Sequence, residues 1–399
     1  MLEFIQRENY LNQLIVLRNT PDIKVVTGIR RSGKSVLIEQ FSDWLKENET
    51  DVNLVLIKLQ DLDYEELLEY KKLHQYAVDN YIEGKHNVLI IDEVQLCENF
   101  EKVINSLHSK RIYDIYITGS NAFLLSSDLA TLFTGRTMEV KVFPFSFKEY
   151  ISYYQPTDYI EEQFDRYVRE GGMAGSYVYS SDKLKYDYIK DVYDTIMLKD
   201  LVKKYGIRNI EEANKISSYL MDNVSNILSS TSVCETLNRN GSTITNKTVD
   251  KYITLLCRAF LFYEAKAYNL KGKRYLEGKK KYYLCDTGIR YAVNGTRNMD
   301  FGRVYENIVF IELLRRGYDV YVGKLYQKEI DFVAQRGSEK LYIQVSDNIS
   351  NPDTFEREYS PLLAIKDAYP KMILARTRHE DYDYQGIVIK NIANWLLEE

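Results

Sequence analysis

The sequence has few of the residues that build disulfides and metal sites. Its 399 residues include only four cysteines and four histidines. The cysteines, at positions 97, 234, 257 and 285, lie far apart and form no Cys-x-x-Cys pair. Structural zinc sites use such closely spaced ligands. We therefore expect reduced thiols in a cytosolic protein and no structural zinc.

Long apolar runs and flexible linkers are also missing. No apolar run approaches the ~20 residues that a membrane span requires, so we expect no membrane partner. The first ten residues, MLEFIQRENY, lack the basic and apolar stretches of a signal peptide, which makes the cytoplasm the expected location. There are six prolines and no glycine- or serine-rich tract. We expect a compact chain of about two or three domains.

Neither sign of charge dominates. The sequence contains 53 Lys and Arg against 58 Asp and Glu, a net charge of −5. This balance excludes a polycationic surface, so any nucleic-acid site must be a local patch. Hydrophobic residues make up 45% and charged residues 28% of the chain, which argues against a disordered or fibrous protein.

The first informative motif is a glycine-framed loop. Residues 28–35 read Gly-Ile-Arg-Arg-Ser-Gly-Lys-Ser, after an apolar run at 23–27 and before a helical pattern. Strand, GxxxxGK[ST] loop and helix together predict a phosphate-binding loop. The glycines let the backbone bend around phosphates, and the helix N-terminus adds partial positive charge. The residues that we expect to contact the nucleotide are Gly28, Arg30, Arg31, Ser32, Gly33, Lys34, Ser35 and Val36.

Two of these loop residues have further roles. We expect Lys34 to reach the β- and γ-phosphates and Ser35 to ligate Mg²⁺. A second apolar run, at 88–91, ends in Asp92 and Glu93. A buried strand that delivers an acidic pair to its carboxyl end is what a magnesium-dependent NTPase needs. We predict Asp92 as a metal ligand and Glu93 as the group that polarises the attacking water.

A third apolar run, at 112–117, is followed by Thr-Gly-Ser-Asn. We expect its end to lie between the first two strands, which would let Ser120 or Asn121 bond the γ-phosphate or the water. Arg136 follows a predicted helix and precedes another strand. Either it stabilises transition-state charge on a neighbouring subunit's nucleotide, or it is a surface arginine at a helix end.

These motifs carry a resemblance. GIRRSGKS, LIIDEVQ, ITGSNAFLL, LFTGR and VFPFSFKEY, in this order, resemble an AAA-type ATPase domain over residues 1–200. The whole chain resembles a bacterial and archaeal family of ATP-binding proteins with an AAA domain, a winged helix and a restriction-endonuclease-like C-terminal domain. The resemblance implies ATP as the nucleotide. The family's Gly-Gly-aromatic-Pro lid motif reads Gly-Gly-Met-Ala here, at 171–174.

The fold class expected is α/β: a parallel P-loop NTPase sheet with a helical lid, then a winged helix and an α/β endonuclease-like domain. We expect these parts at 1–150, 151–208, 209–298 and 299–399. In the winged helix, Thr245, Asn246, Lys247 and Thr248 would begin a DNA-recognition helix. Its wing, from Lys271 to Lys281, carries six positive charges against Glu277. The alternative is a winged helix that contacts only proteins.

The C-terminal part resembles the PD-(D/E)XK nuclease fold, with Glu306 and Asp331 at two of its acidic positions. The resemblance implies a metal held between that aspartate and an acidic residue on the next strand, with a lysine two positions on. Those two positions are Gln344 and Ser346 here. A neutral amide is a weaker magnesium ligand, and serine does not replace an ammonium. We therefore expect a structural or binding module and no nuclease activity.

The leading hypothesis is a Mg²⁺-dependent ATPase that couples ATP binding and hydrolysis to an interaction of its winged-helix and C-terminal parts. The partner stays open between double-stranded DNA, another protein and a second copy of the chain. Two alternatives also stay open: an ATP-regulated nuclease that uses Glu306 and Asp331, and a signalling scaffold that binds ATP without hydrolysis.

Overall fold

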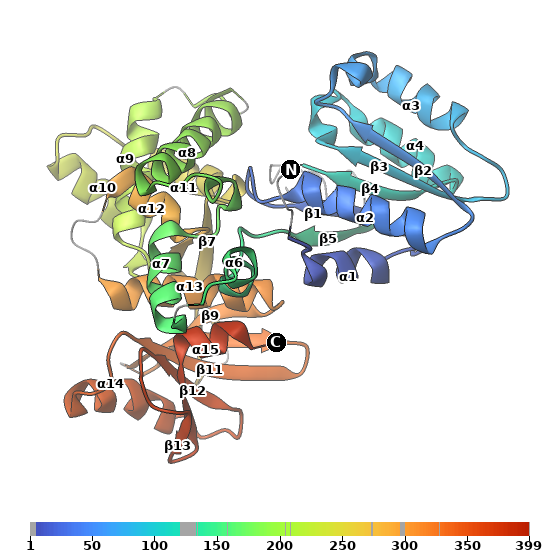
Figure 1. The fold of residues 1–399 in the computed structure, drawn as a ribbon. Coiled ribbons are helices and arrows are strands. Elements are labelled where there is room, and N and C mark those ends of the chain that lie inside the picture. The colour runs from blue at the N-terminus through green and yellow to red at the C-terminus, as the bar shows by residue number, and fades with distance from the viewer. Residues whose placement is uncertain are drawn as a thin grey trace. The chain divides into compact units, whose positions relative to one another are not determined.

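The computed structural model describes residues 5–119, 133, 135–157, 159–203, 205–207, 209–272, 274–295, 300–326 and 328–398. The chain forms two compact units, Met1–Phe143 and Pro144–Glu399. Each unit has its own β-sheet (Figure 1).

Over its described residues, the first unit contains a five-stranded parallel sheet with the order β2-β3-β4-β1-β5. Its strands are β1 (Ile23–Thr27), β2 (Val52–Lys58), β3 (His86–Asp92), β4 (Asp114–Thr118) and β5 (Thr137–Lys141). Its helices are α1 (Glu8–Val16), α2 (Lys34–Asn48), α3 (Tyr70–Asp79) and α4 (Phe100–Lys110), with 3₁₀ turns η1 (Leu62–Leu68) and η2 (Val94–Leu96).

Both faces of this sheet are covered, because alternate residues of each strand feed two separate cores. Val26 packs with Leu37 and other residues of α1 and α2, whereas Val25 packs in the core that contains Leu73 of α3 and Val103 of α4. All five residues of β1 are buried. This is a P-loop NTPase fold, and it confirms the predicted fold class for this part of the chain.

The second unit begins with helices. In chain order they are α6 (Phe147–Tyr154), α7 (Ile160–Glu170), η4 (Ala174–Ser176), α8 (Asp182–Thr195), the π-helix η5 (Ile196–Lys203), α9 (Ile210–Asp222), α10 (Ser230–Arg239), α11 (Asn246–Arg258), α12 (Thr287–Asn294), α13 (Phe301–Arg315), α14 (Pro352–Leu363) and α15 (Ile392–Leu397). Among the residues with a described position, no helix is both long and apolar enough to cross a membrane.

One sheet runs through most of the second unit. Its described strands have the order β13-β14-β12-β11-β10-β9-β7-β8-β6. They are β6 (Ile227–Leu228), β7 (Phe262–Asn269), β8 (Arg274–Leu284), β9 (Asp319–Leu325), β10 (Lys328–Arg336), β11 (Glu339–Ser346), β12 (Lys371–Ala375), β13 (Tyr382–Tyr384) and β14 (Ile387–Asn391). The hairpin that we predicted as a wing is β7–β8, and β7 also pairs in parallel with β9. The sheet therefore contains strands from both sides of residue 298, the predicted boundary. The predicted domain limits remain predictions.

The Gly171-Gly172 pair has a local structural explanation. The buried Asp286 carboxylate accepts hydrogen bonds from the Gly172 and Gly288 backbone N–H groups. A Cβ atom on Gly171 would lie 2.1 Å from Asp286 Oδ1, and one on Gly172 would lie 2.1 Å from the Phe145 carbonyl oxygen. Burial raises the pKa of Asp286 to about 6. These two short distances leave no room for a Cβ atom, so both positions require glycine.

Candidate functional site

The predicted phosphate-binding loop lies between β1 and α2, as its sequence context requires. Gly28 has a φ of +141°, and a Cβ there would lie 2.1 Å from the Val142 carbonyl oxygen. Gly33 has a φ of +90° and forms the N-cap of α2. Both positions favour glycine for its positive φ, and Gly28 also for the close approach of the Val142 backbone. Arg31 also has a positive φ, of 66°.

Lys34 is the first residue of α2, and its side chain turns back over the loop. Its Nζ donates hydrogen bonds to the carbonyl oxygens of Gly28 (3.1 Å) and Ile29 (3.0 Å). The side chain is buried. Ser35 and Val36 follow in the first turn of α2 and are half-buried. The ammonium group is thus held inside the loop whose glycines frame the predicted phosphate site.

The acidic pair lies at the carboxyl end of β3. Asp92 and Glu93 are both buried. The Thr118 hydroxyl, at the end of β4, donates a hydrogen bond to Asp92 Oδ1 and accepts one from the Glu93 N–H at 2.9 Å. Glu93 has a left-handed backbone conformation (φ 55°), and the Gln95 amide donates to its carboxylate. One hydroxyl therefore fixes the turn that presents both carboxylates.

The strand order brings these groups to one edge of the sheet. Strand β4 lies between β3 and β1, which confirms the predicted place of the third strand. The Gly119 N–H, directly after β4, donates to the Val26 carbonyl oxygen of β1 (3.2 Å). The loop after β1, the acidic pair after β3 and Thr118 of β4 thus share the carboxyl edge, where open α/β sheets place ligand groups. Ser120 and Asn121, predicted at this edge, lie outside the described residues.

Arg136 lies at the opposite edge. Its carbonyl oxygen accepts a hydrogen bond from the N–H of Ile23, the first residue of β1, at 2.8 Å. Gly28 follows five residues later along β1, or about 16 Å at ~3.3 Å per residue. An arginine side chain does not bridge that distance to the loop of its own subunit. A catalytic role for the exposed Arg136 side chain therefore requires a second copy of the chain.

Arg7 is a residue of this region that sequence reasoning missed. Its buried guanidinium donates to the carbonyl oxygens of Ser32 (2.8 Å) and Phe143 (3.0 Å) and stacks over the ring of Tyr10. It therefore ties the segment before α1 to the phosphate-binding loop. No motif includes Arg7. Thr118 and Gln95, in contrast, lie within the quoted motifs. Their roles are identified by their hydrogen bonds to Asp92 and Glu93, which the sequence does not show.

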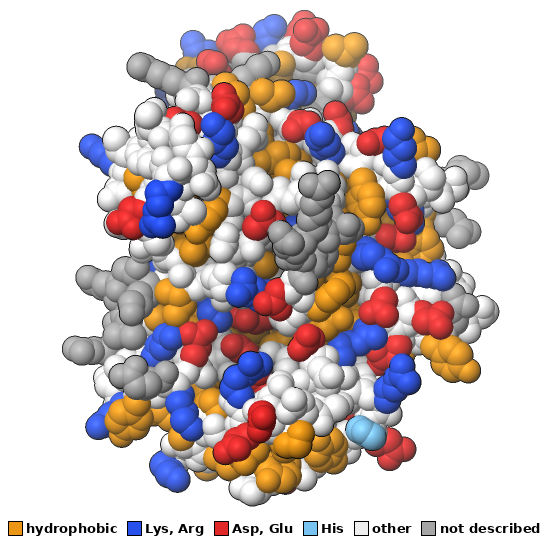
Figure 2. Space-filling view, turned by 90° about the vertical axis from the view of Figure 1, so that its left-hand side faces the viewer, with side chains coloured by type: hydrophobic (Ala, Val, Ile, Leu, Met, Phe, Trp, Pro, Cys, Tyr) orange, Lys and Arg blue, Asp and Glu red, His pale blue; other side chains and the backbone are white. Residues whose placement is uncertain are grey.

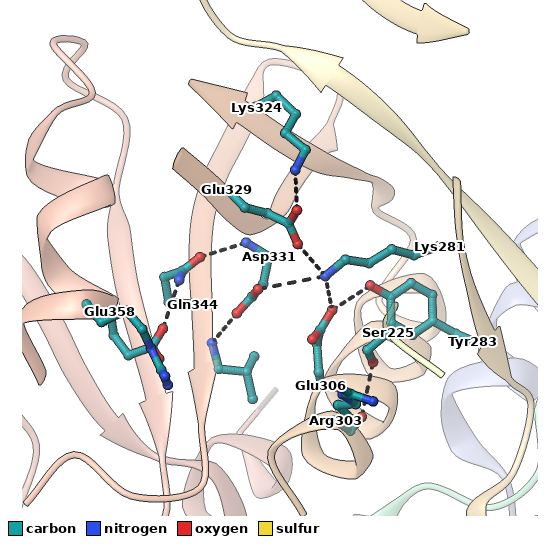
Figure 3. Close-up of polar contacts among 12 residues, drawn as sticks. Ser225, Lys281, Tyr283, Arg303, Glu306, Lys324, Glu329, Asp331, Gln344 and Glu358 are labelled. Carbon is teal, nitrogen blue, oxygen red and sulfur yellow. Dashed lines mark hydrogen bonds and ion pairs between the residues drawn. The ribbon is translucent and has the colours of Figure 1, made fainter. Parts of the chain in front are cut away.

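A second charged cluster lies in the second unit (Figure 3). Lys281 of β8 places its Nζ 2.8 Å from Glu306 Oε1 and 2.8 Å from Glu329 Oε1, and 3.9 Å from Asp331 Oδ1. Of these residues, Glu306 and Asp331 were predicted together, whereas Lys281 and Glu329 were not predicted in this site. The carboxylates line a cavity of about 470 Å³ between α13, β10, β11 and α14.

This cluster corrects the prediction for the wing. Lys281 was assigned to phosphate contacts, but its side chain is only 3% exposed and is ion-paired inside the cluster. Lys280 pairs with Glu264 on the neighbouring strand at 2.9 Å. The reason is strand alternation: successive side chains of β8 point to opposite faces, so the lysine run does not lie on one face.

Comparisons with known proteins support an AAA domain in the first unit. The family model of the AAA domain matches residues 20–151, and that of a domain of unknown function (DUF8612) matches residues 161–300. An uncharacterized protein of Haemophilus influenzae is 37% identical over 399 residues, with 99% of each chain covered. The chain belongs to an AAA-type ATP-binding protein family.

The family likeness extends over both units, because the Haemophilus relative matches along almost the whole length. An uncharacterized protein of Methanocaldococcus jannaschii is 27% identical over 388 residues, which cover 92% of this chain and 84% of the relative. Among solved structures, AMPPCP-bound DnaA from Aquifex aeolicus has a TM-score of 0.33 and 16% identity, with 63% of this chain and 88% of that chain covered.

Thr118 gives a first prediction for the AAA domain. Replacing it by valine keeps the shape but removes two hydrogen bonds, each worth about 1 kcal/mol, that orient Asp92 and Glu93. For the predicted ATPase reaction, we expect kcat to fall about ten- to hundredfold with little change in KM. Steady-state kinetics measures both constants. The matched control is Thr20→Val, whose hydroxyl bonds the Leu17 carbonyl oxygen before β1. An unchanged kcat for Thr118→Val would contradict the positioning role.

Proposed function

We propose that this protein is a Mg²⁺-dependent ATPase that uses its nucleotide state to control an interaction made by residues 144–399. The observation that carries the proposal is the shared edge of the first sheet. There the loop that holds Lys34 and the strand end that holds Asp92 and Glu93 lie on the same edge, with the end of β4 between them.

The residues at this edge suit each part of the reaction. The loop backbone and Lys34 would bind the phosphates, with the Lys34 ammonium exchanging its bonds to loop carbonyls for phosphate oxygens. The Ser35 hydroxyl and the Asp92 carboxylate are the oxygen donors that Mg²⁺ prefers, and the ion, when bound, neutralises phosphate charge. Glu93 would orient the attacking water and accept its proton. Gln95 and Thr118 position that carboxylate.

The part of the second unit that supports a DNA partner is the run α9-β6-α10-α11-β7-β8. This is the element order of a winged helix, and β6 pairs with β8 beside the β7–β8 hairpin. Thr245 caps α11 by accepting from the Thr248 N–H, and Asn246 and Lys247 are exposed in its first turn. Such a position suits contact with a DNA groove.

The charge distribution limits that contact to a small area. On the face in Figure 2, the coloured Lys and Arg side chains alternate with Asp and Glu. Lys280 and Lys281 are paired to carboxylates, whereas Lys271 is exposed at the turn of the hairpin, where it can contact phosphates. We therefore propose a local contact through α11 and the hairpin turn, with a protein partner as the alternative.

The test is ATP turnover by the wild type and Lys34→Ala, each with and without double-stranded DNA. The matched control is Lys46→Ala, an exposed lysine on the same helix that pairs with Asp43. We expect turnover that requires Lys34, does not require Lys46 and rises with DNA. Turnover that requires Lys34 but ignores DNA would indicate a protein partner. Tight ATP binding without turnover under any condition would contradict the ATPase and favour a scaffold.

A further inference from the structure

The cavity in the second unit lies where the resemblance to PD-(D/E)XK nucleases implies a divalent metal. Its lining includes Glu306 from α13, Glu329 and Asp331 from β10, and Gln344 and Ser346 from β11. Whether a metal fits there depends on which oxygen atoms are free to coordinate it, and on the charge already present among them.

Strand β11 provides neither the acidic metal ligand nor the lysine that an active PD-(D/E)XK site carries on this strand. The only ligand atom of Gln344, Oε1, accepts a hydrogen bond from the Asp331 N–H at 2.7 Å, while its Nε2 donates to the buried Glu358 at 2.9 Å. The Ser346 hydroxyl donates to the Asn348 carbonyl oxygen at 3.3 Å. Within the described ranges, no group of three or more Asp, Glu, His or Cys side chains is arranged to hold a metal ion.

The carboxylates of the cluster are already bonded to cations and other donors. Besides Lys281, Glu306 Oε1 accepts a hydrogen bond from the Tyr283 hydroxyl at 2.7 Å. Glu329 is also paired with Lys324. Asp331 Oδ2 accepts the Val345 N–H at 2.9 Å. Figure 3 shows the Lys281 ammonium in the middle of these groups, with the three carboxylates around it.

The balance of charge in the cluster also argues against a bound divalent ion. Two ammonium groups, of Lys281 and Lys324, offset most of the charge of the carboxylates at 306, 329 and 331. A divalent ion bound to Glu306 Oε1 would lie within a few ångströms of the Lys281 ammonium, which is 2.8 Å from the same oxygen. In a buried site such like charges repel strongly. The ion and the ammonium therefore compete for one position.

We infer that Lys281 is the resident cation of this cluster and takes the place of a divalent metal. The ammonium that the nuclease pattern places on β11 is absent there, and another one arrives from β8, the second strand of the hairpin. The cavity thus holds an ammonium group where a metal would lie. Its carboxylates are not arranged around a metal ion while Lys281 lies between them, and they close on a divalent ion only when Lys281 is removed.

The test is Mn²⁺ binding to the full-length chain without nucleotide, followed by the EPR signal of free Mn²⁺. The variants are Lys281→Met, the matched control Lys280→Met, and Lys281→Met combined with Glu306→Gln. We expect Lys281→Met to bind one more Mn²⁺ per chain than the wild type, at least about tenfold more tightly than any wild-type site. We expect the extra site to be absent from Lys280→Met and lost again in the double variant.

Two results would overturn the inference. One is a folded Lys281→Met protein, with a wild-type near-ultraviolet circular dichroism spectrum, that binds no extra Mn²⁺. The other concerns Glu329→Gln, a change at a partly exposed side chain that tests the cluster even if Lys281→Met does not fold. We expect this variant and the wild type to bind equal amounts of Mn²⁺. Loss of one Mn²⁺ from Glu329→Gln would show a native metal site.

Discussion

Replacing Glu93 by glutamine is expected to lower the ATP turnover number by about 10²- to 10⁴-fold, the range that a general base contributes, and to leave ATP binding unchanged. Glutamine keeps the size of the side chain, and its amide oxygen can still accept the hydrogen bond from Gln95. It removes only the negative charge and the proton-accepting oxygen. Turnover by coupled assay and ATP affinity by calorimetry separate the two effects.

The contrast with Lys34→Ala makes this prediction specific. Removing the Lys34 ammonium takes away the charge that would meet the phosphates, so ATP affinity itself is expected to fall at least about a hundredfold. Glu98→Gln serves as the control, because this exposed carboxylate lies a few residues beyond the acidic pair. Normal turnover by Glu93→Gln would refute the assignment of the general base, even if the Lys34 result holds.

The elements that frame the candidate nucleotide site could be predicted from the sequence because their signals are local. The strand, loop and helix around Gly28 and Gly33 are contiguous in sequence, and the glycines are required by the backbone itself. The buried run before Asp92 identifies a strand by its composition. The three apolar runs of β1, β3 and β4 likewise predict parallel strands that are buried on both faces. Arg7 is different: its contact with Ser32 joins segments 25 residues apart, and no local pattern encodes it.

The cluster around Lys281 shows the limit of that reasoning. In the sequence Lys281 stands among other lysines in a segment that suggests a solvated wing. Its burial depends on the pairing of β7 with β9, which brings the hairpin beside the later strands. Such pairing between distant strands is not readable from a run of charges. The same strand pairing brings the Lys281 ammonium to carboxylates that lie more than 20 residues away in the sequence.

Replacing Lys281 by methionine is expected to destabilise the second unit by about 3–5 kcal/mol, because it leaves buried carboxylates without their partner. Equilibrium urea unfolding measures this in a Trp44→Phe background, where the fluorescence reports on Trp395 alone, since the chain has two tryptophans. Lys280→Met is the control. Its pair with Glu264 is partly exposed, so we expect a loss of no more than about 1 kcal/mol.

The pH dependence of the stability loss in Lys281→Met identifies the cause of that loss. Burial raises the pKa values of Glu306 and Asp331, and the nearby Lys281 ammonium lowers them. Removing the ammonium therefore raises both pKa values further. A carboxyl with a raised pKa in the folded state favours folding at low pH, and this contribution is lost as the pH rises through that pKa. The deficit of Lys281→Met is thus expected to be smaller at pH 5 than at pH 8. An equal deficit at both pH values would mean that lost packing, and not uncompensated charge, destabilises the variant.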